Sequence, residues 1–164
     1  MEQSEAKEFI LKNKLDTLNS VKCAEIGKAC VCGNLRKASR MISQIYDEFL
    51  KPSGLKATQT ALLMTVKSFG GATVSKLAKS TITDRTTVTR NLKLLEKKGL
   101  VKTEPGEDQR EKVVTITDKG IDALLCAYPF WEEAQHHVAE IIGEDKSANI
   151  VKELSGMVSM LRKR

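Results

Sequence analysis

The stretch Asp84–Gly99, DRTTVTRNLKLLEKKG, predicts one helix with an apolar side and a polar, basic side. Val88, Leu92 and Leu95 recur at intervals of three and four residues, which places them on one stripe of a helix. The polar and basic residues fall on a different stripe. We therefore expect the apolar stripe to dock on the protein and the other side to be displayed.

Both ends of this helix are marked in the sequence. Asp84 is a favourable N-cap because its carboxylate accepts orphan backbone N–H groups, and Gly99 is suited to a left-handed terminus. No acidic residue lies between Arg85 and Lys93. Hydroxyl, amide and basic groups are those that contact the phosphates and base edges of DNA. The candidate DNA-contacting residues of this helix are Arg85, Thr86, Thr87, Thr89, Arg90 and Lys93.

A helix with a basic face is more often a solvated surface than a reader of nucleic acid, so its neighbours in the chain matter. A short helix is predicted before it, over residues 74–79 with Thr73 as its cap. Two strands are predicted after it, over residues 100–104 and 111–117. This order is that of a winged helix-turn-helix, and it favours DNA binding.

The predicted strands form a β-hairpin wing. Pro105 and Gly106 break the pattern between them, and Val114 and Ile116 alternate with threonines in the second strand. Arg110 near the tip is suited to a narrow minor groove, where the potential is most negative, with Asp108 close enough to hold its guanidinium. The alternative for this pair is an ordinary ion pair on a surface loop.

Composition indicates a globular protein with a polyanionic partner. Hydrophobic residues make up 41% and charged residues 29% of the 164 residues, while aromatic residues, at 4%, leave little for stacking on single-stranded bases. The formal net charge is +6, and residues 34–102 hold 14 basic against four acidic residues. A localised positive excess is the electrostatic signature of DNA binding, and a membrane surface is the competing polyanion.

Other functional classes find little support in the sequence. No run of about 18 apolar residues and no signal peptide is recognisable, so we expect a cytoplasmic protein without a membrane partner. The chain has no nucleophile elbow, no glycine-rich phosphate loop and no metalloprotease helix motif, so we expect neither enzymatic activity nor a cofactor. A more serious alternative is a winged helix that only grips another protein, without sequence-specific DNA binding.

The predicted fold is mainly α-helical with a small β-hairpin wing, and it has four parts. A long C-terminal helix, kinked at Pro129, is followed by a last helix whose apolar face suggests contact with a second subunit. The predicted parts are an N-terminal helix and Cys-containing turn (1–33), a dimer-linking helix (34–54), the winged helix-turn-helix (55–120) and C-terminal dimerisation helices (121–164).

Three motifs carry a resemblance to a known family: DRTTVTRNLKLLEKKGLV at 84–101, Asp108-Gln109-Arg110, and VTITDKG at 114–120. With them, the chain resembles the multiple antibiotic resistance regulator (MarR) family of winged-helix repressors. The resemblance implies a homodimer that binds a pseudo-palindromic operator and releases it when a small molecule or an oxidant acts.

The resemblance also assigns residues. It places Arg85, Thr86, Thr89 and Arg90 at the DNA-contacting positions of the helix, and Asp108 and Arg110 in the wing motif. One departure concerns the preceding turn, where the family usually has an apolar residue followed by glycine. This chain has Thr81 and Ile82 there, which leaves the angle of the DNA-contacting helix open.

The sequence leaves the identity of the effector open, and the cysteines are the best indication of it. Free cysteines in a cytoplasmic protein are most often reduced, inert core fillers. VCGNLRKASR at 31–40, however, resembles a motif of the organic hydroperoxide resistance branch of the family. This implies Cys32 as a peroxide-sensing residue, with Cys30 or Cys126 as its resolving thiol and with Tyr46 matching a tyrosine of that branch. Other tyrosines of the branch are missing.

Two further effectors remain as alternatives. An aromatic acid could bind between the arms and touch Arg40 or Tyr46. A metal is weakly supported, because Cys30 and Cys32 lack the usual spacing of zinc ligands and His136 and His137 point to different helix faces. We therefore predict no metal site.

Overall fold

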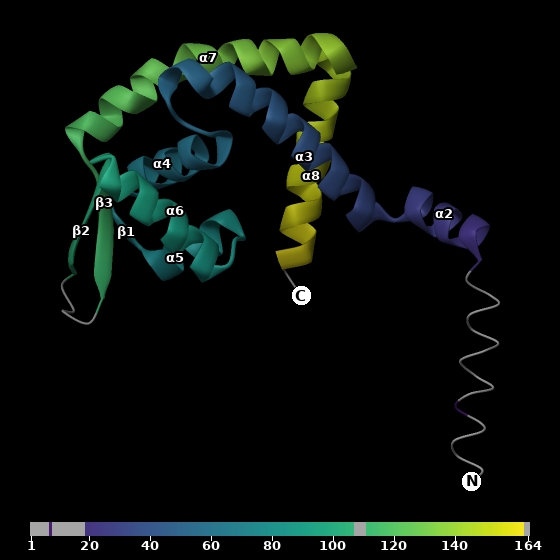
Figure 1. Cartoon of the computed structure of the whole chain (residues 1–164), viewed down its shortest axis with the longest axis horizontal. Helices are drawn as coiled ribbons and strands as arrows, with labels where there is room; N and C mark the ends of the chain where they lie inside the picture. The colour runs from purple at the N-terminus through teal and green to yellow at the C-terminus, as the bar shows by residue number, and fades with distance from the viewer. Residues whose placement is uncertain (1–6, 8–18, 107–110, 163–164) are drawn as a thin grey trace. The chain divides into compact units, whose positions relative to one another are not determined.

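The computed structural model describes residues 7, 19–106 and 111–162, and it confirms a mainly helical chain with a small antiparallel sheet (Figure 1). The chain divides into two units, residues 1–41 and 42–164. No helix in the described ranges is long and apolar enough to cross a membrane. The helices are α2 (Ser20–Ala29), α3 (Val31–Leu50), the short 3-10 helix η1 (Lys51–Ser53), α4 (Ala57–Phe69), α5 (Val74–Thr81), α6 (Arg85–Lys97), α7 (Asp118–Ile142) and α8 (Glu144–Arg162), and the strands are β1 (Ala72–Thr73), β2 (Val101–Pro105) and β3 (Lys112–Ile116).

The first unit contains α2 and the beginning of α3. The predicted Cys-containing turn before residue 34 is wrong in extent, because only Cys30 separates the two helices. Gly27 and Gly33 lie inside α2 and α3, where glycine costs about 1 kcal/mol relative to alanine and need not end a helix. The side-chain amide of Asn34 donates to two carbonyl oxygens at the break, at 2.8 and 3.0 Å.

The core of the second unit lies among α4, α5, α6 and the sheet. Its largest fully buried apolar side chains include Leu63, Leu77, Leu95 and Val114, one from each of these four elements. The spacing of the apolar residues in 84–99 predicted this role for Leu95. Because each helix contributes an apolar stripe to the same core, their polar sides are left facing outward.

The wing is a sheet of three strands, in the order β1-β3-β2. Strands β2 and β3 form the predicted hairpin, in a register from Val101 opposite Ile116 to Pro105 opposite Lys112. The third strand, β1, was not predicted. It has only two residues, too few to show an alternating pattern, and it pairs with β3 far along the chain.

Two long helices complete the second unit. The hydroxyl of Thr117 caps α7 by accepting from the backbone N–H of Gly120 at 3.1 Å. Helix α7 continues through Pro129, and Gly143, with a φ of 89°, separates it from α8. Figure 1 shows α7 leading away from the sheet toward α8.

The start of α7 is joined tightly to the end of α6. The backbone N–H of Thr117 donates to the carbonyl of Leu100 at 3.1 Å, and its hydroxyl donates to the carbonyl of Gly99 at 2.7 Å. Gly120 lies against the same segment, and a Cβ atom there would collide with the carbonyl oxygen of Leu100 and the side chain of Ile116. Glycine is therefore required at this close approach.

We predict that Gly120→Ala destabilises the protein by about 2–3 kcal/mol, because the added methyl meets backbone that cannot move without breaking the Thr117 hydrogen bonds. Chemical denaturation of the purified variant measures this loss. Gly156→Ala is the matched control, since open space surrounds Gly156 in α8. Equal stability of Gly120→Ala and wild type would contradict the close approach.

Candidate nucleic-acid interface

Helix α6 begins and ends as its sequence predicts. The carboxylate of Asp84 accepts from the backbone N–H of Thr87 at 2.8 Å. Hydrogen bonds from the hydroxyl and then the backbone N–H of Thr87 lower the pKa of Asp84. At the other end Gly99 adopts a left-handed φ of 73°. Both caps keep α6 a rigid helix of 13 residues.

The apolar stripe of α6 docks the helix on the protein. Val88, Leu92 and Leu95 are exposed by only 2%, 6% and 0%. All three belong to the core formed by α4, α5 and the sheet. The opposite side of α6 is consequently held at the surface.

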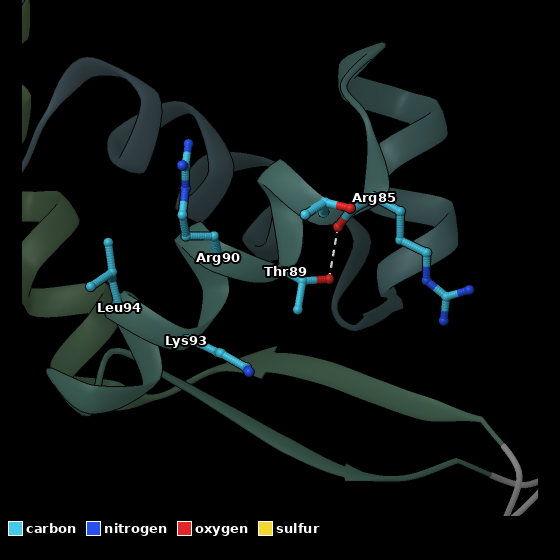
Figure 2. Close-up of a pocket in the computed structure, with 6 residues that line it drawn as sticks. Arg85, Thr89, Arg90, Lys93 and Leu94 are labelled. Carbon is cyan, nitrogen blue, oxygen red and sulfur yellow. Dashed lines mark hydrogen bonds between the residues drawn. The ribbon is translucent and has the colours of Figure 1, made fainter.

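The displayed side of α6 forms a shallow hollow (Figure 2). Arg85, Arg90 and Lys93 are exposed around it, and none of these three cations forms an ion pair within the described part of the chain. The hydroxyl of Thr89 donates to the carbonyl of Arg85 at 2.7 Å. Uncompensated positive charge on a rigid helix suits a polyanion. The residues lining the hollow are Arg85, Thr86, Thr89, Arg90, Lys93 and Leu94.

The structure therefore brings together five of the six predicted residues of α6. The exception is Thr87, which is half-buried and is not among the residues lining the hollow. Leu94 was missed by the sequence analysis. The spacing could have identified Leu94, because it follows Arg90 by four residues and therefore lies one turn further along the same side of the helix.

A second groove connects α6 to the wing. Thr89 and Lys93 line it from the helix, and Glu104 and Lys112 are among the residues that line it from β2 and β3. Glu104 is paired with Lys102 at 2.8 Å, whereas Lys112 forms no ion pair with a described residue. The wing thus adds a cation beside the displayed side of α6. The predicted wing residues Asp108 and Arg110 lie outside the described residues.

The turn before α6 has a distinct backbone geometry. Ile82 adopts a left-handed conformation with φ of 51°, and it is the one non-glycine residue with positive φ in the described ranges. This conformation costs roughly 1–2 kcal/mol for an L-residue. The turn therefore reaches the left-handed geometry that glycine would adopt freely.

The last helix contacts the end of α5 next to this turn. The guanidinium of Arg162 donates to the carbonyls of Lys79 and Ser80 at 3.3 and 3.0 Å.

The candidate effector residues lie elsewhere. In the first unit Cys30, between α2 and α3, is exposed, and so are Cys32 and Arg40 of α3. The Cys30 sulfur accepts from the backbone N–H of Gly33 at 3.4 Å. In the second unit Cys126 is exposed on α7. The hydroxyl of Tyr46 donates to the side-chain oxygen of Gln135, and burial raises the pKa of Tyr46.

The two histidines have other neighbours. His136 lies 3.1 Å from Glu140, one turn along α7. The ring of His137 packs against that of Phe49, with centroids 5.2 Å apart. The two rings therefore meet different groups, as expected for adjacent residues of a helix.

Comparison with known proteins assigns this arrangement to a family. The model of the MarR family matches residues 53–111. The chain is 34% identical over 117 residues to YwoH of Bacillus subtilis, described as an uncharacterized HTH-type transcriptional regulator, and the match covers 70% of this chain and 84% of YwoH. It is 26% identical over 123 residues to the HTH-type transcriptional regulator SarZ of Staphylococcus epidermidis, covering 74% of this chain and 82% of SarZ.

A solved structure agrees with this assignment. The transcriptional regulator MosR of M. tuberculosis, crystallised in complex with DNA, matches with a TM-score of 0.72 and 34% sequence identity. The match covers 82% of this chain and 97% of that chain. The similarity therefore extends beyond the helix-turn-helix to the flanking helices.

We predict that the cap of α6 depends on pH. The pKa of Asp84 is lowered from 3.8 in the folded protein, so its carboxylate contributes stability above pH 3.8 that is lost as the pH falls through the lowered pKa. Asp84→Asn keeps an acceptor without the charge. The difference in unfolding free energy between wild type and Asp84→Asn should shrink on acidification. A difference that does not change with pH would contradict this role for the carboxylate.

Proposed function

This chain belongs to the MarR family of DNA-binding transcriptional regulators, and we propose that it acts as a homodimeric repressor that binds a pseudo-palindromic operator and releases it on a chemical signal. The observation that carries the proposal is the hollow on α6, where three cations that form no ion pair with a described residue surround threonine side chains. In the proposed complex α6 lies in the major groove. Its basic side chains contact phosphates and base edges there.

The proposed contacts follow the positions of the side chains. Arg90 and Lys93 lie on the displayed side of α6 and are long enough to reach base edges, and Arg85 at the N-terminal end is suited to phosphate. Asp108 and Arg110 of the wing are proposed to act in the adjacent minor groove. The proposed contact residues on α6 are Arg85, Thr86, Thr87, Thr89, Arg90 and Lys93.

The proposal of a homodimer rests on the C-terminal helix. The predicted apolar face of α8, formed by Ile150, Leu154, Val158 and Leu161, is exposed in the single chain. Such a continuous apolar face marks an interaction surface. A two-fold pair would present two α6 helices to successive turns of DNA, about 34–36 Å apart.

We predict that Arg90→Ala weakens operator binding by about 1–3 kcal/mol and, if Arg90 reads a base, relaxes specificity at one position per half-site. Gel retention on the duplex upstream of the chain's own gene, at two salt concentrations, measures the effect. Lys152→Ala on α8 is the matched control, because Lys152 is exposed and lies outside the α6 hollow.

The same experiment separates the proposal from its rival. Binding that survives competitor DNA and falls steeply with salt supports an operator-binding regulator. A wild-type protein that binds no duplex specifically would instead support a winged helix that only contacts other proteins. Unchanged affinity of Arg90→Ala would remove Arg90 from the contact surface.

The proposed signal is an oxidant acting at the start of α3 or a small molecule that touches Arg40 or Tyr46. In favour of the oxidant, Cys32 is exposed near the start of α3, where solvent can reach its sulfur. Cys30 or Cys126 is the proposed resolving thiol. In favour of a small molecule, Tyr46 is half-buried, and its hydroxyl donates a hydrogen bond to the side chain of Gln135 on α7.

We predict that Cys32→Ser abolishes release of the operator by peroxide, because serine cannot form a sulfenic acid. Gel retention before and after peroxide treatment measures release, and reduction afterward should restore wild-type binding. Cys23→Ser is the matched control and should retain the response. A Cys32→Ser protein that still leaves DNA on oxidation would rule out Cys32 as the sensor and favour a different signal.

A further inference from the structure

We propose that Leu94 reads the 5-methyl group of a thymine in each operator half-site, an inference that rests on the proposed function of α6. Leu94 lines the hollow together with Arg90 and Lys93. Among the described residues that line the hollow, Leu94 is the one apolar residue. Figure 2 shows Leu94 and Lys93 extending from the same end of α6, with Arg90 one turn before them.

The exposure of Leu94 separates it from the other apolar residues of α6. Its side chain is 47% exposed, whereas Val88, Leu92 and Leu95 are exposed by 6% or less. Leu94 therefore contributes little to the docking of the helix. A single exposed leucine is common on protein surfaces and needs no explanation by itself. What distinguishes Leu94 is the charge that surrounds it.

The surrounding charge identifies the partner. Arg85, Arg90 and Lys93 are exposed and form no ion pair with a described residue. A partner must therefore offer negative charge to these cations and an apolar group to Leu94. The major groove of duplex DNA offers both, because phosphates line its edges and the 5-methyl group of thymine projects from its floor.

Among the four bases only thymine carries that methyl group, so the contact would discriminate sequence. Burying one methyl group is worth about 0.8 kcal/mol, which corresponds to about a fourfold change in affinity. Thr86 and Thr89 also line the hollow, and each carries a candidate methyl group. The hydroxyl of Thr89 donates to the carbonyl of Arg85. The experiment must separate Leu94 from both threonines.

The test uses the full-length protein and an operator duplex isolated by its binding to the purified protein. Each thymine of one half-site is replaced in turn by deoxyuridine, which lacks only the 5-methyl group, and the dissociation constant is measured. For wild type we expect about a fourfold loss at one thymine position. For Leu94→Ala we expect weaker binding to the thymine duplex and no further loss with deoxyuridine at that position.

Three further variants sharpen the result. Leu94→Met keeps an apolar side chain and should retain sensitivity to the methyl group, which also shows that a change at this exposed position leaves the fold intact. Thr86→Ser and Thr89→Ser each remove only one competing methyl group. If either serine variant abolishes the sensitivity and Leu94→Ala retains it, that threonine reads the thymine and the inference about Leu94 is overturned.

The remaining outcomes distinguish this inference from the proposed function. If wild type binds its operator but no thymine replacement changes the affinity, the role of Leu94 is overturned and operator binding stands. If wild type binds no duplex specifically, the proposed function fails and the role of Leu94 fails with it.

Discussion

The close approach of Gly120 to Leu100 is the constraint on which the rest of the second unit depends. At this point the end of α6, the start of β2, the end of β3 and the start of α7 meet. Thr117 donates to the carbonyls of Gly99 and Leu100, so the two segments are joined by hydrogen bonds as well as by packing. A side chain at position 120 would separate them. The junction therefore sets the direction of α7 relative to α6, and it connects the helix that leads to α8 with the helix that carries the basic surface.

The basic surface depends on a second feature, the division of α6 into a buried side and an exposed side. Its buried stripe anchors the helix, and the anchoring leaves Arg85, Arg90 and Lys93 in solvent without acidic partners in the described ranges. Cations that are not already paired can bind phosphates without first breaking an existing ion pair.

The turn between α5 and α6 differs from the pattern expected for the MarR family, yet its geometry is compatible with the fold. Ile82 occupies a left-handed conformation that glycine adopts at no steric cost. The strain costs roughly 1–2 kcal/mol. This cost is smaller than the free energy that α5 and α6 gain by burying Leu77 and Leu95 in the core. The interior thus imposes the turn conformation. The sequence alone left the angle of α6 open for this reason.

Local rules were enough to predict α6, its caps and the hairpin, because each depends on residues within a few positions of one another. The sequence by itself therefore determined the winged helix-turn-helix order and the candidate surface residues of α6. Tertiary structure decided the rest. Strand β1 exists because Ala72 pairs with Val114 of β3. Tyr46 has a hydrogen-bond partner because α7 brings Gln135 to it. Leu94 is exposed because no other described element covers that side of α6. Periodicity tells which residues share a face of a helix, whereas what covers that face depends on residues far away in the chain.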